Sequence, residues 1–299
     1  MKHESLEDRL VVRLKQEFPD LNFKQVQLNT KGWDHDVLIL DNSFIVRFSK
    51  EKLDPKNFER EIRFLDEFRK ISNLRIPKYT LISRDKTFGG YEMILGEELT
   101  PEKFQTLSSE RRQDFVHQIA AFITKLHTIP LESAKDFGFE QYKSWDSELK
   151  EKEKWFQDEF YPKMSSSLTL EENTFIQNFV LSFCRSQHSV QPVIGHYDLS
   201  HDHIIMAPDG SISGIIDFGD INIGDPAHEF NGFADYDRNL PEQIYELYGG
   251  PKDLAFLKRC HDHYIHRWIY LLYDGRVRRK NEELFREARS KLHEIMNTK

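Results

Sequence analysis

The segment VIGHYDLSHDHIIMAPDGSISGIIDFGD, residues 193 to 220, limits what this chain can fold into more than any other part of the sequence. Apolar runs on both sides of the dipeptide Asp209-Gly210 predict short strands joined by a tight turn. The loop before them is crowded with polar residues, and a polar loop between strands is a common location for catalytic side chains. We therefore expect this segment to carry the chemistry.

The spacing of four residues in this segment indicates phosphoryl transfer. His196 and Asp198 are followed by His203, which fits the kinase pattern H-x-D-x-x-x-x-N with histidine in the last position, and Asp217-Phe218-Gly219 begins fourteen residues later. Phosphoryl transfer requires a carboxylate that orients the attacking hydroxyl, ligands for magnesium and a cation near the phosphates. Each half of the pattern is common by chance, but their order and spacing together favour a kinase.

A second interpretation takes the same loop as the metal cluster of a hydrolase. Five candidate ligands fall within eight residues: His196, Asp198, His201, Asp202 and His203. This interpretation gives no role to the GIIDFGD block that follows, so it is the weaker of the two.

The periodicity of apolar residues divides the chain near Gly96. Before it, the pattern predicts a helix, antiparallel strands, a second helix and two more strands, at residues 4–18, 23–30, 35–40, 43–48 and 55–71 and ending at 91–95. After it, the pattern predicts a helix behind Ser108 and further helices at about 146–160, 169–186, 252–273 and 281–296. The fold class is therefore α+β.

Two sequence blocks resemble the aminoglycoside phosphotransferases, which share the protein-kinase fold, and above all the aminoglycoside 2''-phosphotransferases. The residues that carry the resemblance are His196, Asp198, Ser200, Asp202, His203, Ile204, the block 214–220, Asp225 and Pro226. Weaker similarity covers most of the first 235 residues. The resemblance implies a two-lobed protein-kinase-like fold, with a small antiparallel-sheet nucleotide-binding lobe at 1–95 and a larger, mainly helical catalytic and acceptor-binding lobe at 96–299.

The resemblance also implies roles for the residues of the polar loop. Asp198 would be the catalytic residue that orients the acceptor hydroxyl, and His203 and Asp217 would hold Mg²⁺. His196 and Asp225 would brace the loop.

In the first lobe, the resemblance implies that Arg47 on the third strand contacts the nucleotide phosphates and takes part in catalysis. Glu61 on the following helix would pair with it. Arginine departs from the lysine of protein kinases, and a planar guanidinium is not a point charge. The phosphate-covering loop is expected at residues 29–36, where Gly32 alone offers close backbone approach.

The segment that joins the lobes is expected to bind the purine. Backbone groups of Glu92 and Ile94 would face the base, and Tyr91 precedes them. In the related 2''-phosphotransferases a bulky residue at this position is associated with guanine nucleotides. We therefore expect GTP to be favoured over ATP.

The expected acceptor is a hydroxyl of a cationic aminoglycoside, with antibiotic resistance by inactivation as the role. Glu229 and Asp235 match positions where the 2''-phosphotransferases have carboxylates, which suit ammonium groups. However, His266-Arg267-Trp268 stands where that branch has another acid. A macrolide, amino alcohol or sugar metabolite is therefore the alternative acceptor.

Composition excludes few functions. The formal net charge of −8 argues against a nucleic-acid partner. The sequence shows no membrane span or signal peptide, so we expect no membrane association. Cys184 and Cys260 lie in separate apolar, helix-like runs, which favours buried thiols in the reducing cytoplasm. We expect a monomer or weak dimer.

Overall fold

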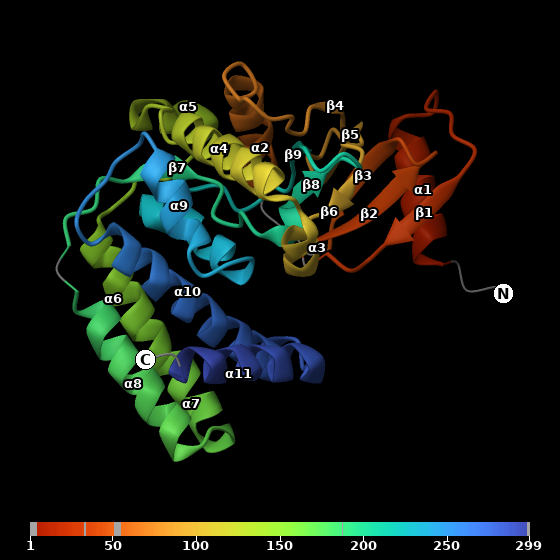
Figure 1. Ribbon diagram of the computed structural model, residues 1–299. Helices are drawn as coiled ribbons and strands as arrows, with labels where there is room; N and C mark the ends of the chain where they lie inside the picture. The colour runs from red at the N-terminus through yellow and green to blue at the C-terminus, as the bar shows by residue number, and fades with distance from the viewer. Residues whose placement is uncertain (1–4, 33, 51–54, 187, 298–299) are drawn as a thin grey trace.

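The computed structural model describes residues 5–32, 34–50, 55–186 and 188–297. A five-stranded antiparallel sheet in the order β1-β2-β3-β5-β4 lies at one end of the molecule, and α6, α8, α10 and α11 lie at the other (Figure 1). The sheet strands are β1 Val26–Asn29, β2 His35–Leu40, β3 Phe44–Ser49, β4 Tyr79–Ile82 and β5 Phe88–Glu92. The expected helix and strands of the first 95 residues are confirmed.

Two helices cover the sheet because its strands alternate their side chains between two faces. On one face, α1 (Leu6–Glu17) buries Leu14 against Val46 and Phe48 of β3. Arg47, which lies between Val46 and Phe48 in β3, points to the opposite face, where α2 (Pro55–Phe68) lies. The alternation therefore directs Arg47 towards the interior beside α2.

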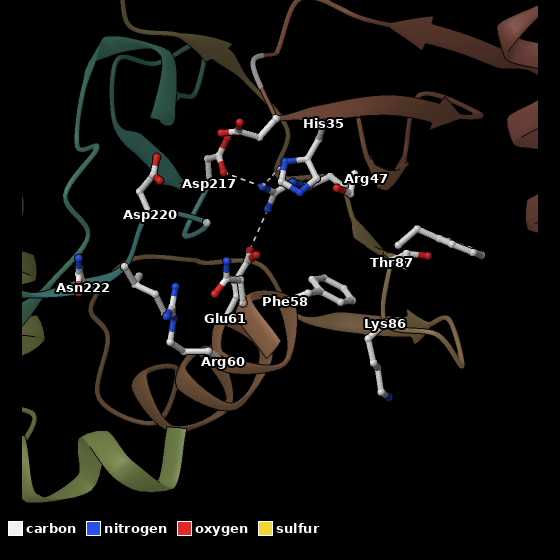
Figure 2. A pocket seen from close by; sticks show the side chains of 16 residues that line it. His35, Arg47, Phe58, Arg60, Glu61, Lys86, Thr87, Asp217, Asp220 and Asn222 are labelled. Atoms are coloured by element: carbon white, nitrogen blue, oxygen red, sulfur yellow. Dashed lines mark hydrogen bonds and ion pairs between the residues drawn. The ribbon is translucent and has the colours of Figure 1, made fainter. Parts of the chain in front are cut away.

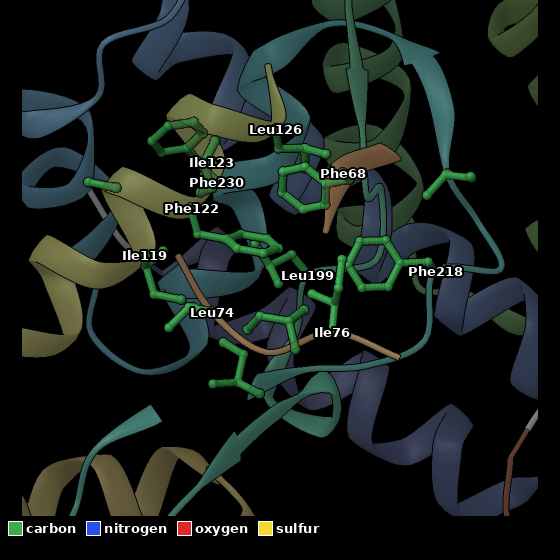
Figure 3. Packing of buried hydrophobic residues seen from close by; sticks show 14 of the residues in the cluster. Phe68, Leu74, Ile76, Ile119, Phe122, Ile123, Leu126, Leu199, Phe218 and Phe230 are labelled. Atoms are coloured by element: carbon green, nitrogen blue, oxygen red, sulfur yellow. The ribbon is translucent and has the colours of Figure 1, made fainter. Parts of the chain in front are cut away.

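Helix α2 belongs to the hydrophobic core of both halves of the chain. Its Phe68 packs edge-on against Phe122 at 5.3 Å between ring centroids and, at a tilted angle, against Phe218 at 6.3 Å (Figure 3). Truncating such a buried ring costs roughly 3–5 kcal/mol. The expected boundary at residues 95 and 96 lies in the connection from β5 to β6, but one apolar cluster continues across it through α2.

The rest of the chain is mainly helical, as expected. Its helices are α3 Pro101–Thr106, α4 Ser109–Leu126, α5 Ala134–Phe137, α6 Trp145–Trp155, α7 Tyr161–Met164, α8 Leu170–Cys184, α9 Leu240–Leu247, α10 Phe256–Tyr273 and α11 Glu282–Met296. The Ser108 hydroxyl caps α4 by accepting from the amide of Arg111. The pattern did not predict α9 or the 3-10 segment Pro226–Asp235.

Two small sheets frame the polar loop. Strands β8 (Ile204–Met206) and β9 (Ile212–Ile215) form the expected hairpin and pair with β6 (Glu97–Glu98), while β7 (Val193–Gly195) pairs with β10 (Asn222–Gly224). Cys184 and Cys260 are buried free thiols, as expected. Within the described part of the chain, no helix is both long and apolar enough to cross a membrane.

Candidate active site

Arg47 is the centre of a buried polar cluster between the sheet and α2. Its Nη1 donates to Glu61 at 2.8 Å and to the Tyr79 hydroxyl at 2.9 Å, and its Nη2 donates to Asp217 at 2.6 Å. Figure 2 shows Glu61, Asp217 and the His35 ring converging on this guanidinium. Only 4% of Arg47 is exposed. The expected pair with Glu61 is thus formed, and Arg47 also joins the first lobe to the Asp217 segment.

His35 is a member of this cluster that the sequence did not reveal. Its Nδ1 lies 3.2 Å from Nη2 of Arg47. Burial, together with the charge of Arg47, lowers the pKa of His35 to about 3, so the ring is neutral and Nδ1 accepts. Histidine at the first position of a strand gives no local signal of such a role.

The loop that is expected to cover the phosphates is held by Lys50. Nζ of Lys50 donates to the carbonyl oxygens of Thr30 and Gly32, each at 2.6 Å. Gly32 is exposed, and residue 33 of this loop lies outside the described residues. The carbonyl of Gly32 is therefore bound by Lys50. The role of the Gly32 backbone towards a phosphate stays a prediction.

The polar loop at residues 196–203, called the catalytic loop below after its expected role, brings Asp198 and His203 close to Asp217. Nδ1 of His203 donates to the backbone carbonyl of Asp198 at 2.7 Å, so Nε2 is the nitrogen that faces Oδ2 of Asp217, 3.6 Å away. Tyr197 and Asp217 both adopt left-handed backbone conformations, with φ of 66° and 62°. Left-handed non-glycine residues cost energy and often occur in functional loops. The structure thus assembles the three residues that the spacing indicated.

The pKa values of the two carboxylates of this site are shifted in opposite directions. Burial would raise the pKa of Asp217, but Arg47 and then His203 hold it well below its usual range. Burial raises the pKa of Asp198, although the neighbouring His203 opposes this. Asp198 has a side chain 45% exposed and is open to an incoming molecule.

His196 supports the loop from within. Its Nδ1 accepts from the amide of Asp198 at 3.3 Å, and its Nε2 donates to the carbonyl of Ile216 at 3.0 Å. Burial, with the charge of His203, lowers its pKa to about 3, so the ring is neutral. Both nitrogens of His196 are therefore used, and neither is available to the metal cluster of a hydrolase.

Glu229 is fully enclosed, with only 2% of the residue exposed. Its two carboxylate oxygens accept from the backbone amides of His196 at 2.9 Å and Tyr197 at 2.6 Å. Asp225 is also buried and accepts from Arg259 of α10 at 2.8 Å and His263 at 3.0 Å. Glu229 therefore contacts the catalytic loop directly, whereas Asp225 anchors the start of the 3-10 segment to α10.

Asp235, the second expected acceptor contact, lies at the end of the 3-10 segment. It accepts from the Tyr264 hydroxyl at 3.0 Å and forms an ion pair with Arg267. Its side chain is 13% exposed. This carboxylate is thus already paired within the protein.

The segment that is expected to bind the purine runs from the end of β5 into the connection to β6. Tyr91 lies opposite Ile45 and Tyr79 in the sheet, is 4% exposed and packs edge-on against Tyr79 at 5.2 Å. Glu92 ends β5 with an exposed side chain, and Ile94 is buried. Tyr91 thus forms part of the wall behind the Arg47 cluster.

A cavity of about 260 Å³ opens beside Arg47, between the start of β2, α2 and the segment after Asp217. Its walls include Arg60 of α2 and Asp220. Burial, followed by the charges of Asp198 and Asp217, raises the pKa of Asp220 to about 6. The cavity lies at the end of the site where the Arg47 and Asp217 charges are concentrated.

Of the two candidate magnesium ligands, the Asp217 carboxylate supplies the oxygen donor that the ion prefers, whereas His203 supplies a nitrogen. Nε2 of His203 and Oδ2 of Asp217 face each other, and Mg²⁺ in phosphotransferases takes few protein ligands because phosphate oxygens and water complete its shell. Among residues 5–32, 34–50, 55–186 and 188–297, no three histidine, cysteine or acidic side chains converge as for a protein-only metal site. The residues fit a shared metal better than a hydrolase cluster.

A buried strand arginine paired with a helix glutamate, facing a loop that carries Asp198 and Asp217, defines a protein-kinase-like phosphotransferase. The chain belongs to the phosphotransferase enzyme family, whose model matches residues 25–256. The expected family, fold class and enzyme class are therefore confirmed.

Several solved structures share the fold across nearly the whole chain. The GDP and kanamycin complex of APH(2'')-IIIa matches with a TM-score of 0.84 at 20% identity, covering 96% of this chain and 97% of that one. The gentamicin complex of APH(2'')-IIa matches with a TM-score of 0.75 at 19% identity, covering 97% and 96%. Macrolide 2'-phosphotransferase type I matches with a TM-score of 0.73 at 17% identity, covering 98% and 99%.

Proposed function

We propose that this protein is a small-molecule kinase that transfers the γ-phosphoryl group of a nucleoside triphosphate to a hydroxyl group. The observation that carries the proposal is the placement of Asp198 and Asp217 on opposite sides of His203, with Arg47 bound to Asp217. This arrangement supplies a carboxylate for the acceptor, candidate magnesium ligands and a fixed cation for the phosphates.

In the proposed reaction, the acceptor oxygen forms a bond to the γ-phosphorus while the bond from that phosphorus to the β–γ bridging oxygen breaks. Asp198 accepts a hydrogen bond from the acceptor hydroxyl, orients it and receives its proton. Arg47 is fixed by Glu61, so its charge needs little reorganisation when negative charge shifts towards the leaving oxygen. When bound by His203 and Asp217, Mg²⁺ supplies charge neutralisation at the phosphates.

We propose GTP as the preferred donor. The support is the bulk of Tyr91, whose ring packs on Tyr79 at the back of the site and narrows the space behind the purine-binding segment. Guanine can pair with backbone groups of Glu92 and Ile94 from a more outward position than adenine requires.

Two acceptor classes are supported by different observations. The sequence blocks shared with the aminoglycoside 2''-phosphotransferases, and the fold shared with a kanamycin complex, favour an aminoglycoside. The ion pair of Asp235 with Arg267 favours an acceptor that is not a polycation, such as a macrolide or another sugar-bearing compound.

The test is a nucleotide-consumption screen with ATP and GTP against aminoglycosides, macrolides and amino alcohols, using the wild type and Asp198→Ala. We expect the variant to lose roughly 100- to 10,000-fold in turnover while its nucleotide affinity stays nearly unchanged. Asp114→Ala on α4 removes an exposed carboxylate far from the site and serves as the control. Loss of nucleotide binding with turnover intact would contradict the role of Asp198.

A further inference from the structure

Arg267 of α10 is held rigidly beside the catalytic loop. Its Nη2 is bound to Asp235, and its guanidinium lies 5.1 Å from the ring centroid of Trp268 and 5.6 Å from that of Tyr264. Stacking on two aromatic rings fixes the plane of an arginine and limits its rotamers. The Arg267–Asp235 ion pair is thus held in place by its aromatic neighbours, although 24% of the arginine side chain is exposed.

The pair lies close to the catalytic loop and to Asp198, the residue expected to orient the acceptor. Gly232, three residues before Asp235, packs so closely on the loop that an added Cβ would lie 2.6 Å from the carbonyl oxygen of Leu199. The charge of Arg267 also acts on Asp198, where it opposes the rise in pKa caused mainly by burial. The pair is separate from the Arg47 cluster, whose guanidinium binds Asp217.

We propose that Arg267 determines acceptor selectivity by neutralising Asp235, so that the acceptor is neutral or singly charged and not a polycation. This inference rests on the kinase function proposed above. An ammonium group placed beside Asp235 would meet a carboxylate whose charge is already balanced, and it would be repelled by the adjacent guanidinium. A hydroxyl or ether oxygen suffers no such repulsion.

The test measures binding rather than turnover. Kanamycin, as a polycationic probe, and erythromycin, which carries a single amine, are titrated calorimetrically into the nucleotide-loaded enzyme. Arg267→Gln exposes the Asp235 charge, and a charge-assisted hydrogen bond to an ammonium is expected to tighten kanamycin binding by between about tenfold and a hundredfold. Erythromycin affinity should change by less than about threefold, since its one amine can be oriented away from Asp235.

Three further variants make the result specific. Arg267→Lys keeps the positive charge and should bind kanamycin as weakly as the wild type. The double variant Asp235→Asn with Arg267→Gln should lose the gain, because it has no carboxylate to expose. Arg276→Gln changes the net charge equally but lies in the π-helical segment Asp274–Arg278 with a side chain 48% exposed, and it should behave as the wild type.

The inference is overturned if wild-type enzyme binds kanamycin as tightly as Arg267→Gln does, or if the gain persists in the double variant. Thermal unfolding of each variant separates a local effect from loss of fold. Failure of the kinase function is seen independently, as absence of phosphorylated product with every acceptor in the nucleotide-consumption screen.

Discussion

Glu229→Gln distinguishes two roles for a residue whose acidity alone suggests acceptor binding. In the structure, both oxygens of Glu229 accept backbone amide protons, from His196 at 2.9 Å and from Tyr197 at 2.6 Å. Glutamine has the same shape but only one oxygen. Its amide group would point a donor at one of these donors, so the substitution breaks one of the two bonds without opening a cavity.

The size of the effect follows from burial. An amide left without an acceptor in a buried site costs about 1–3 kcal/mol of stability. The second consequence concerns Tyr197, whose left-handed backbone is held by the hydrogen bond from its amide to Glu229. Because Asp198 follows Tyr197 directly, loss of this bond displaces the Asp198 carboxylate. A displacement of the catalytic carboxylate by about 1 Å lowers turnover by roughly 100-fold.

The assay compares kcat and KM for the acceptor found in the screen, with nucleotide affinity measured by calorimetry. We expect kcat to fall by roughly 100-fold, while the acceptor KM and nucleotide affinity change little. Glu242→Gln on α9, an exposed glutamate, controls for the loss of charge. If Glu229→Gln raises the acceptor KM and leaves kcat intact, Glu229 contacts the acceptor and the bracing role is refuted.

The pH dependence of the free energy of unfolding provides a second test of the role of Glu229. Burial raises the pKa of Glu229 to about 7 from 4.5, although the two amides oppose this rise. The folded protein therefore binds this proton more tightly than the unfolded chain, so the free energy of unfolding falls by about 3 kcal/mol as pH rises through this window. Glutamine cannot titrate, so the stability deficit of Glu229→Gln should be largest near pH 4.5 and smaller above pH 7.

Two further variants test the nucleotide side. Asp217→Asn removes a charged candidate ligand and should weaken magnesium-dependent nucleotide binding by about tenfold to a hundredfold; unchanged magnesium dependence in a titration would exclude Asp217 as a ligand. Tyr91→Ala should raise kcat/KM for ATP by a similar factor with little effect on GTP, whereas Tyr91→Phe keeps the ring and should retain the wild-type preference. A wild type that already prefers ATP, or an unchanged ATP/GTP ratio in Tyr91→Ala, would make Tyr91 a packing residue.

The parts of the fold that could be predicted are those with local signals. The Ser108 cap marks the start of α4, and alternating apolar residues mark β2 and β3. Asp198 and His203 could be paired because they are only five positions apart along the chain, and a short hairpin brings Asp217 back to the same place. The residues are close along the chain in each case, so their spacing in the sequence is enough to predict that they lie close together in space.

The 3-10 segment and its contacts could not be predicted in the same way. Glu229 meets Tyr197 across 32 positions of sequence, and Asp235 meets Arg267 across another 32. An acidic residue shows the same local pattern whether it faces a ligand, a backbone amide or an arginine. Only the tertiary structure shows which of these partners the carboxylate of the acidic residue contacts.

The two acidic residues expected to bind the acceptor therefore lead to different conclusions about it. Glu229 is enclosed against the catalytic loop and gives no information about the acceptor, because its bonds position Asp198 for any substrate. Asp235 lies at the end of the 3-10 segment and is paired with Arg267, which the sequence had already marked as a departure from the aminoglycoside 2''-phosphotransferases. A kinase of this fold can thus keep its phosphoryl-transfer site while a single arginine changes the charge that an acceptor meets.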